Sequence, residues 1–202
     1  MAAPTGSFSL GPDTGRVVIK TTRAGLAARA GHDLTIEVTR WSAQVEVPAD
    51  SADSADKAGG AGAAGGAGGA GDLAAATVRA DLDLGSLEVR EGSGGAMPLT
   101  DRDRREIKKQ MTGILGSATA TFASSRVIPS GASAGAIEGT VTLNGKTQPA
   151  RLQLTASGDG QYRGSATLAQ SGFGIKPYSG FFGALKLKDE VTLEFQVTLP
   201  SS

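Results

Sequence analysis

Apolar and polar residues alternate along many short runs of this chain, and this period of two most strongly limits the folds open to it. The clearest run is the last one, in which every second residue is apolar (Val191, Leu193, Phe195, Val197 and Leu199). Successive side chains of a strand point to opposite faces, so the run predicts a strand with one buried face. Comparable runs occupy residues 16–22, 34–38, 41–47, 77–84, 117–127, 137–143, 151–155 and 162–170. We therefore expect eight or nine antiparallel strands.

One segment has helical character. Thr100 and Asp103 have the spacing of a capping box, and Ile107 and Met111, four residues apart, form a narrow apolar stripe. The fold class is thus all-β with one short helix. A β-barrel would remove the exposed sheet edges, and an eight-stranded barrel can hold a ligand. A two-sheet sandwich fits the alternation nearly as well, and periodicity does not choose between them.

The stretch 58–71 contains only Ala and Gly and accounts for eight of the 30 glycines of the chain. Such a sequence buries too little apolar surface to offset its ordering entropy. We therefore interpret residues 49–71 as a disordered or flexible Ala/Gly-rich loop insert. Residues 1–48 are too few to form a domain without disulfides or metals. The prediction is a single domain over residues 1–202.

Charge and residue counts exclude several classes of function. Twenty basic residues balance twenty acidic ones, which argues against nucleic-acid binding. The chain has no Cys and one His, so thiol chemistry and multi-histidine metal sites are excluded and no cofactor is expected. No signal peptide and no apolar run of about 20 residues are visible, so we expect a cytoplasmic protein without stable membrane insertion.

Several motifs, taken in their order, resemble the YceI-like family. They are GHDL (31–34), LTDRDRREIKK (99–109), GTVTLNGKTQPARLQLTA (139–156) and FGIKPYSGFFGALKLKDEVTLEFQVTL (173–199). The resemblance implies an extended, antiparallel, eight-stranded lipocalin-like β-barrel. It also implies that the interior holds a long amphipathic molecule, typically an isoprenoid, and that homodimers are frequent in the family. The GHDL and GFFGALKL forms are similar to a cytosolic branch of the family.

Two polar residues are candidate ligand contacts. His32 would anchor a ligand head group or act as a general base; the alternative is a structural His that hydrogen-bonds a loop. Arg102 would meet an anionic head group if the helix caps the barrel, whereas the alternative for the basic cluster around it is a solvated helix face.

Aromatic residues complete the expected ligand-binding set, which consists of His32, Trp41, Arg102, Phe122, Phe173, Tyr178, Phe181 and Phe182. Four of the nine aromatic residues lie within residues 173–182, where they would line a pocket mouth, form a dimer contact or pack in the core. Small residues at expected inward positions favour an unfilled interior: Ala43, Ala80, Ala118, Ala120 and Ala166.

The function expected from these observations is binding, with sequestration or transport, of a hydrophobic chain-like ligand of the isoprenoid or fatty-acyl type. We expect no catalytic residue. The alternatives are a small enzyme that uses His32 as acid or base on a lipid-like substrate, and a homodimeric interaction or structural module built on Phe181 and Phe182.

Overall fold

The fold is an antiparallel β-sheet with one α-helix, given by a computed structural model that describes residues 5–49, 72–116, 118–131, 133–158 and 160–199. The strands are β1 (Gly6–Leu10), β2 (Gly15–Ala24), β3 (Asp33–Val38), β4 (Trp41–Val47), β5 (Thr77–Asp83), β6 (Leu87–Ser93), β7 (Thr119–Ser130), β8 (Ala134–Leu143), β9 (Lys146–Gly158), β10 (Gln161–Ala169), β11 (Ser179–Gly180) and β12 (Leu185–Thr198). The helix is α1 (Asp101–Leu115). Short 3₁₀ turns are η1 (Ala28–Ala30), η4 (Leu73–Ala75), η5 (Leu84–Ser86), η6 (Gln170–Phe173) and η7 (Phe181–Gly183). The predicted all-β class with one helix is confirmed for these residues.

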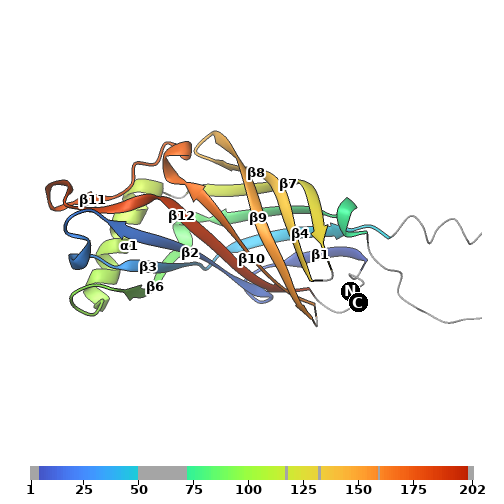
Figure 1. The fold of residues 1–202 in the computed structure, drawn as a ribbon, viewed down its shortest axis with the longest axis horizontal. Helices are drawn as coiled ribbons and strands as arrows, with labels where there is room; N and C mark the ends of the chain where they lie inside the picture. The colour runs from blue at the N-terminus through green and yellow to red at the C-terminus, as the bar shows by residue number, and fades with distance from the viewer. Residues whose placement is uncertain (1–4, 50–71, 117, 132, 159, 200–202) are drawn as a thin grey trace, which may run out of the picture.

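The strands form one sheet in the order β1-β4-β5-β7-β8-β9-β10-β12-β2-β3-β6, and β11 pairs with β12. β1 and β2 follow each other in the chain, and they pair with β4 and β3, which also follow each other. The two ends of the path therefore lie against the same stretch of chain, and the sheet curls around an interior. Figure 1 shows the long strands running obliquely along the molecule, with α1 and β11 at one end.

The described residues form twelve strands, whereas the alternation predicted eight or nine and the family resemblance implied eight, so the eight-strand count is not confirmed. The sequence pattern missed the three shortest additions: β1, which contains Ser and Gly, β6, which carries three charged residues, and the two-residue β11. Three longer segments (6–24, 33–47 and 77–93) are each interrupted once and so give two strands each; the alternation separated 34–38 from 41–47 but did not show the other two pairs. A strand count therefore depends on kinks that hydrophobic alternation does not report.

A polar cluster joins two of these interruptions. Thr39 donates its backbone N–H (3.4 Å) and its hydroxyl (2.8 Å) to the carbonyl of Ser86, and the Ser86 hydroxyl accepts from the Arg40 N–H at 2.9 Å. The Ser86 hydroxyl also donates to the Asp83 carbonyl at 2.7 Å. The Arg40 guanidinium beside Asp83 lowers the pKa of that carboxyl. We call Thr39, Arg40, Asp83 and Ser86 the kink cluster, because it supplies hydrogen bonds where the strand ladder is broken.

The helix begins as predicted. The Thr100 hydroxyl accepts from the Asp103 N–H at 3.2 Å, and the Asp103 carboxylate accepts from the Thr100 N–H at 2.9 Å. The Thr100 hydroxyl also donates to the Asp103 carboxylate at 2.6 Å, and this bond, together with the bond from the Thr100 N–H, lowers the pKa of Asp103. The predicted Asn144-Gly145 hairpin between β8 and β9 is also confirmed, with φ of 53° and 71°, values that Asn and Gly tolerate best.

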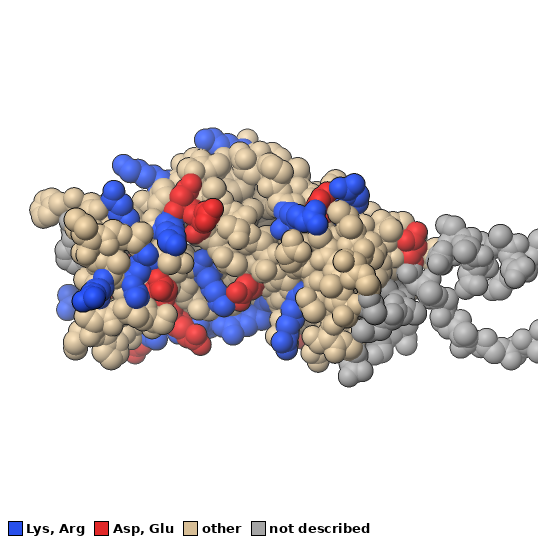
Figure 2. Space-filling model, in the orientation of Figure 1, with Lys and Arg blue, Asp and Glu red and all other residues tan. Residues whose placement is uncertain are grey.

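The two faces of the sheet differ in character. Figure 2 shows basic and acidic side chains interspersed over the face of the molecule in view. They form cross-strand ion pairs such as Lys20–Glu194 (2.8 Å) and Arg126–Glu138 (2.6 Å). Arg151 forms a second ion pair with Glu138. The inner face is apolar; its most buried member is Val38, 1% exposed.

Residues 50–71, most of the expected 49–71 insert, lie outside the described residues, so the insert and the single-domain assignment stay predictions.

The kink cluster gives the first prediction. Ser86→Ala should lower the free energy of unfolding by about 1 kcal/mol, because the partly buried hydrogen bonds to the Arg40 N–H and the Asp83 carbonyl are both lost. Urea denaturation measures this change. Ser9→Ala is the matched control, since the Ser9 hydroxyl bonds Gln44 at an exposed position of β1, and it should change stability little. Equal effects of the two substitutions would contradict a stabilising role for the cluster.

Candidate functional site

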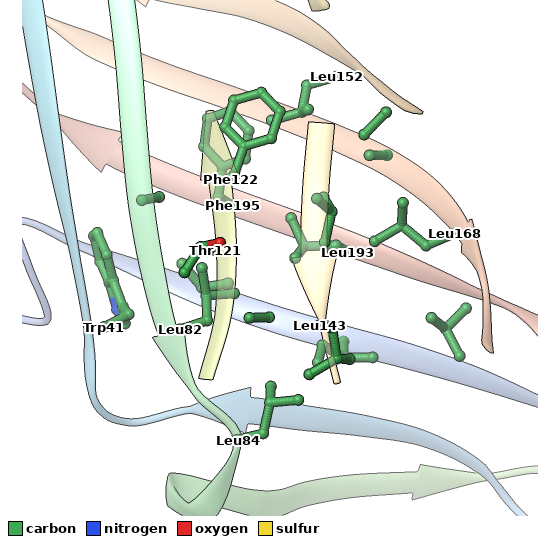
Figure 3. A pocket seen from close by; sticks show the side chains of 18 of the residues that line it. Trp41, Leu82, Leu84, Thr121, Phe122, Leu143, Leu152, Leu168, Leu193 and Phe195 are labelled. Atoms are coloured by element: carbon green, nitrogen blue, oxygen red, sulfur yellow. The ribbon is translucent and has the colours of Figure 1, made fainter. Parts of the chain in front are cut away.

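The curled sheet encloses one large cavity with a volume of about 370 Å³. Every strand except β11 contributes to its wall, and α1 and η6 contribute at one end. Figure 3 shows side chains of β4, β5, β7 and β12, among them Trp41, Leu82, Phe122 and Leu193, in this wall. The volume falls within the range of small-molecule binding sites.

The wall is almost entirely apolar because the inward positions of successive strands align in register. One row runs through Ile36, Ile19, Leu193 and Ala166 on β3, β2, β12 and β10. Another joins Ala43, Ala80, Phe122 and Val141 on β4, β5, β7 and β8. Further lining residues are Leu10, Val17, Leu34, Val45, Val47, Val78, Leu82, Leu84, Leu87, Ala120, Val127, Ile137, Leu143, Ala150, Leu152, Leu154, Leu168, Leu187, Val191, Phe195, Val197 and Leu199.

Small residues leave the interior open. Of the five alanines expected to point inward, Ala43, Ala80, Ala120 and Ala166 line the cavity, whereas Ala118 packs against the core without lining it. Glycine contributes differently: a Cβ on Gly164 would lie 2.4 Å from the Phe195 ring. Gly164 therefore allows the Phe195 ring to lie against β10.

Polar lining residues concentrate toward the α1 end. Gln110 lies on α1, Gln170 begins η6, and Lys176 and Tyr178 follow η6. Farther in, burial raises the pKa of the Tyr162 hydroxyl. Thr21 of β2 also lines the cavity; it was not singled out from the sequence, although it continues the inward alternation of Val17 and Ile19.

Hydrogen bonds fix the η6 segment of the wall. The Ser171 N–H and hydroxyl both donate to Asp189, which lowers the pKa of that carboxyl, and the Gln170 side chain donates to the Lys188 carbonyl at 3.0 Å. From β9, the Gln148 side chain donates to the Gly172 carbonyl at 3.0 Å. These contacts hold Phe173, 4% exposed, in the cavity wall.

Comparison with known proteins agrees with this geometry. The sequence profile of the YceI-like domain matches residues 8–199. The chain belongs to the YceI-like family. A similar solved structure is that of Burkholderia cenocepacia BcnA, with a TM-score of 0.57 and 18% sequence identity over 92% of this chain and 96% of that chain. At this identity the similarity shows a shared fold. A search of curated proteins found no match.

Within this YceI-like fold, the expected site residues divide into two groups. Trp41, Phe122, Phe173 and Tyr178 line the cavity, whereas His32, Arg102 and Phe182 do not. Arg102 is exposed on α1, and Phe182 is fully exposed on η7. The side chain of Phe181 lies outside the described part of the structure. A ligand-binding role for any of these residues stays a prediction.

His32 lies just before β3, and its Nε2 is 2.8 Å from the carbonyl oxygen of Met97. A Cβ on Gly95 would be 2.3 Å from the same nitrogen, so the imidazole lies directly against the backbone of the segment that leads to α1. Its observed contact is thus with a loop of the protein itself.

Two further findings concern the described residues alone. They contain no group of three or more His, Cys, Asp or Glu side chains placed to hold a metal ion. None of their helices combines the length and the hydrophobicity required to cross a bilayer.

The position of His32 gives the second prediction. His32→Ala should lower the free energy of unfolding by about 1 kcal/mol through loss of the Met97 hydrogen bond. It should leave the affinity for hexadecanoic acid unchanged, because the imidazole is not in the cavity wall. Urea denaturation and titration of Trp41 emission measure the two quantities. A large loss of affinity with unchanged stability would instead support His32 as a ligand anchor.

Proposed function

We propose that this protein binds a hydrophobic chain-like ligand of the isoprenoid or fatty-acyl type inside the curled sheet and sequesters or carries it. The observation that carries the proposal is the apolar cavity of about 370 Å³ inside the curled sheet. Membership of the YceI-like family, whose members resemble lipocalins and typically hold isoprenoid chains, supports the same class of ligand.

The shape of the cavity favours a chain over a compact ligand. The lining residues from Val191 on β12 to Leu199, just past the end of that strand, span about 26 Å at the usual rise of a strand. Each methylene buried there would contribute ~0.8 kcal/mol, so a long chain gains affinity along its length. We propose that Trp41, Phe122, Phe173 and Tyr178 contact it.

We further propose that the binding unit behaves as an eight-stranded lipocalin-like barrel. If the interrupted segments 6–24, 33–47 and 77–93 each count as one ribbon, the pairing of β2 with β12 and of β5 with β7 joins them to the five remaining long strands. The kink cluster, at the interruption between β3 and β4 and between β5 and β6, supports this continuity.

The proposed function is non-catalytic. The alternative enzyme would use His32, the only imidazole of the chain, on a bound lipid. The imidazole contacts Met97 and is not part of the cavity wall, which favours binding over acid–base catalysis on a cavity ligand.

Blocking the cavity tests the proposal. Ala120→Phe places a ring in the cavity, where it should displace about two methylenes of a bound chain. The affinity for hexadecanoic acid or farnesol should therefore fall by about tenfold. Trp41, the only tryptophan, lines the cavity and reports binding by its emission. Ala123→Phe is the matched control, because Ala123 is exposed on the same strand and does not line the cavity.

Wild-type affinity should persist in Ala123→Phe. Native mass spectrometry and organic extraction of the purified protein provide an independent test of bound ligand. Failure of the wild-type protein to bind either probe, or an equal loss in both variants, would contradict binding inside the cavity.

We also propose a homodimer formed through the exposed apolar tip at the α1 end. Phe182 and Leu26 are fully exposed, and their loops are joined by the Ala27 N–H donating to the Ala184 carbonyl at 2.9 Å. Phe182 has a φ of 55°, a costly conformation for a bulky residue. The chain has no net charge to oppose self-association.

Phe182→Ser should therefore convert the dimer into a monomer while leaving hexadecanoic acid binding unchanged. Light scattering coupled to size-exclusion chromatography measures the mass. Asp13→Ser, a change in the exposed turn between β1 and β2, is a control that should remain dimeric. A wild-type monomer at high protein concentration would exclude the homodimer.

A further inference from the structure

Thr21 is a polar residue in the wall of an apolar cavity. It is 8% exposed, and its Oγ1 is buried without a hydrogen-bond partner among the described residues. The other buried polar residue of the core, Ser86, both donates and accepts through its hydroxyl. An unpartnered buried hydroxyl is costly in the empty protein, so its presence in a ligand cavity calls for a partner that is not part of the chain.

The surroundings of Thr21 supply no such partner. In register it faces Leu34 on β3 and Val191 on β12, and Val191 faces Leu168 on β10. All three line the cavity. The next row inward consists of Ile36, Ile19, Leu193 and Ala166, so the Thr21 hydroxyl is the one hydrogen-bonding side chain in these two described rows.

Polarity along the cavity increases from the row of Thr21 toward the α1 end. Gln170 comes two residues after Leu168. The Tyr178 carbonyl accepts a hydrogen bond at 3.0 Å from the N–H of Leu187, which lies beyond Val191 along β12. Lys176, which also lines the cavity, is exposed. A charged head group would keep more of its hydration beside Lys176 than in the apolar row of Thr21.

We propose that the Thr21 hydroxyl hydrogen-bonds a neutral oxygen of the ligand, a hydroxyl or a carbonyl, and thereby orients the chain with its apolar end away from α1. A hydroxyl side chain can donate to either group and can accept from an alcohol. This assignment rests on the proposed function and adds the chemical class of the ligand's polar end and its direction in the cavity.

Two probes of equal chain length, hexadecanol and hexadecane, test the proposal on the full chain by Trp41 emission. The wild-type protein should prefer hexadecanol. Thr21→Val replaces the hydroxyl by a methyl group of similar shape. It should lower the affinity for hexadecanol by about tenfold and leave the affinity for hexadecane unchanged. The melting temperature of the empty variant should be equal to or above that of the wild type, because an unpartnered hydroxyl is removed.

Two more variants complete the test. Thr21→Ser keeps the hydroxyl and should keep the preference for hexadecanol, and Thr192→Val, on β12 outside the cavity lining, should keep it as well. An unchanged preference in Thr21→Val would overturn the role of Thr21 while leaving the proposed function intact. Failure of both probes to bind the wild-type protein would overturn the proposed function itself.

Discussion

The curl of the antiparallel sheet is the constraint on which the other features of this protein depend. β1 and β2 are consecutive in the chain, and so are β3 and β4. β1 pairs with β4 at one end of the strand order and β2 pairs with β3 near the other, so these two ends of the sheet are linked through the same segments of chain. The kink cluster maintains hydrogen bonds where the ladder is interrupted. An interior bounded by a curled sheet then follows, and its contents depend on the size of the inward side chains.

The inward side chains do not fill that interior. Ala43 and Ala80 face each other across β4 and β5, and Ala120 and Ala166 occupy inward positions elsewhere. Protein cores normally contain few voids, so a cavity of about 370 Å³ within one sheet is a feature that a ligand would complete. The same sheet separates this apolar interior from an outer face of cross-strand ion pairs.

Sequence reasoning found the elements better than it found the site. The alternation located the long strands, Thr100 and Asp103 located the helix start, and Asn144-Gly145 located a hairpin. Four aromatic residues of the expected set line the cavity, because strand alternation and the 173–178 segment place them there. His32 and Arg102 were selected for their chemistry alone, and chemistry does not specify which way a loop or helix residue faces. Thr21 was overlooked because a threonine in a strand is ordinary until its burial and lack of a partner are known.

The sequence by itself determined the all-β class, the short capped helix and a core poor in large side chains, since these depend on local periodicity and residue size. The tertiary structure decided the number of strands, the course of the sheet and the identity of the residues around the cavity. Those features depend on register and on kinks such as the one at Thr39 and Arg40, which bring together residues far apart in the chain. The exposed Phe182 and the buried Thr21 are distinguished only at that level, because burial is a property of the whole sheet.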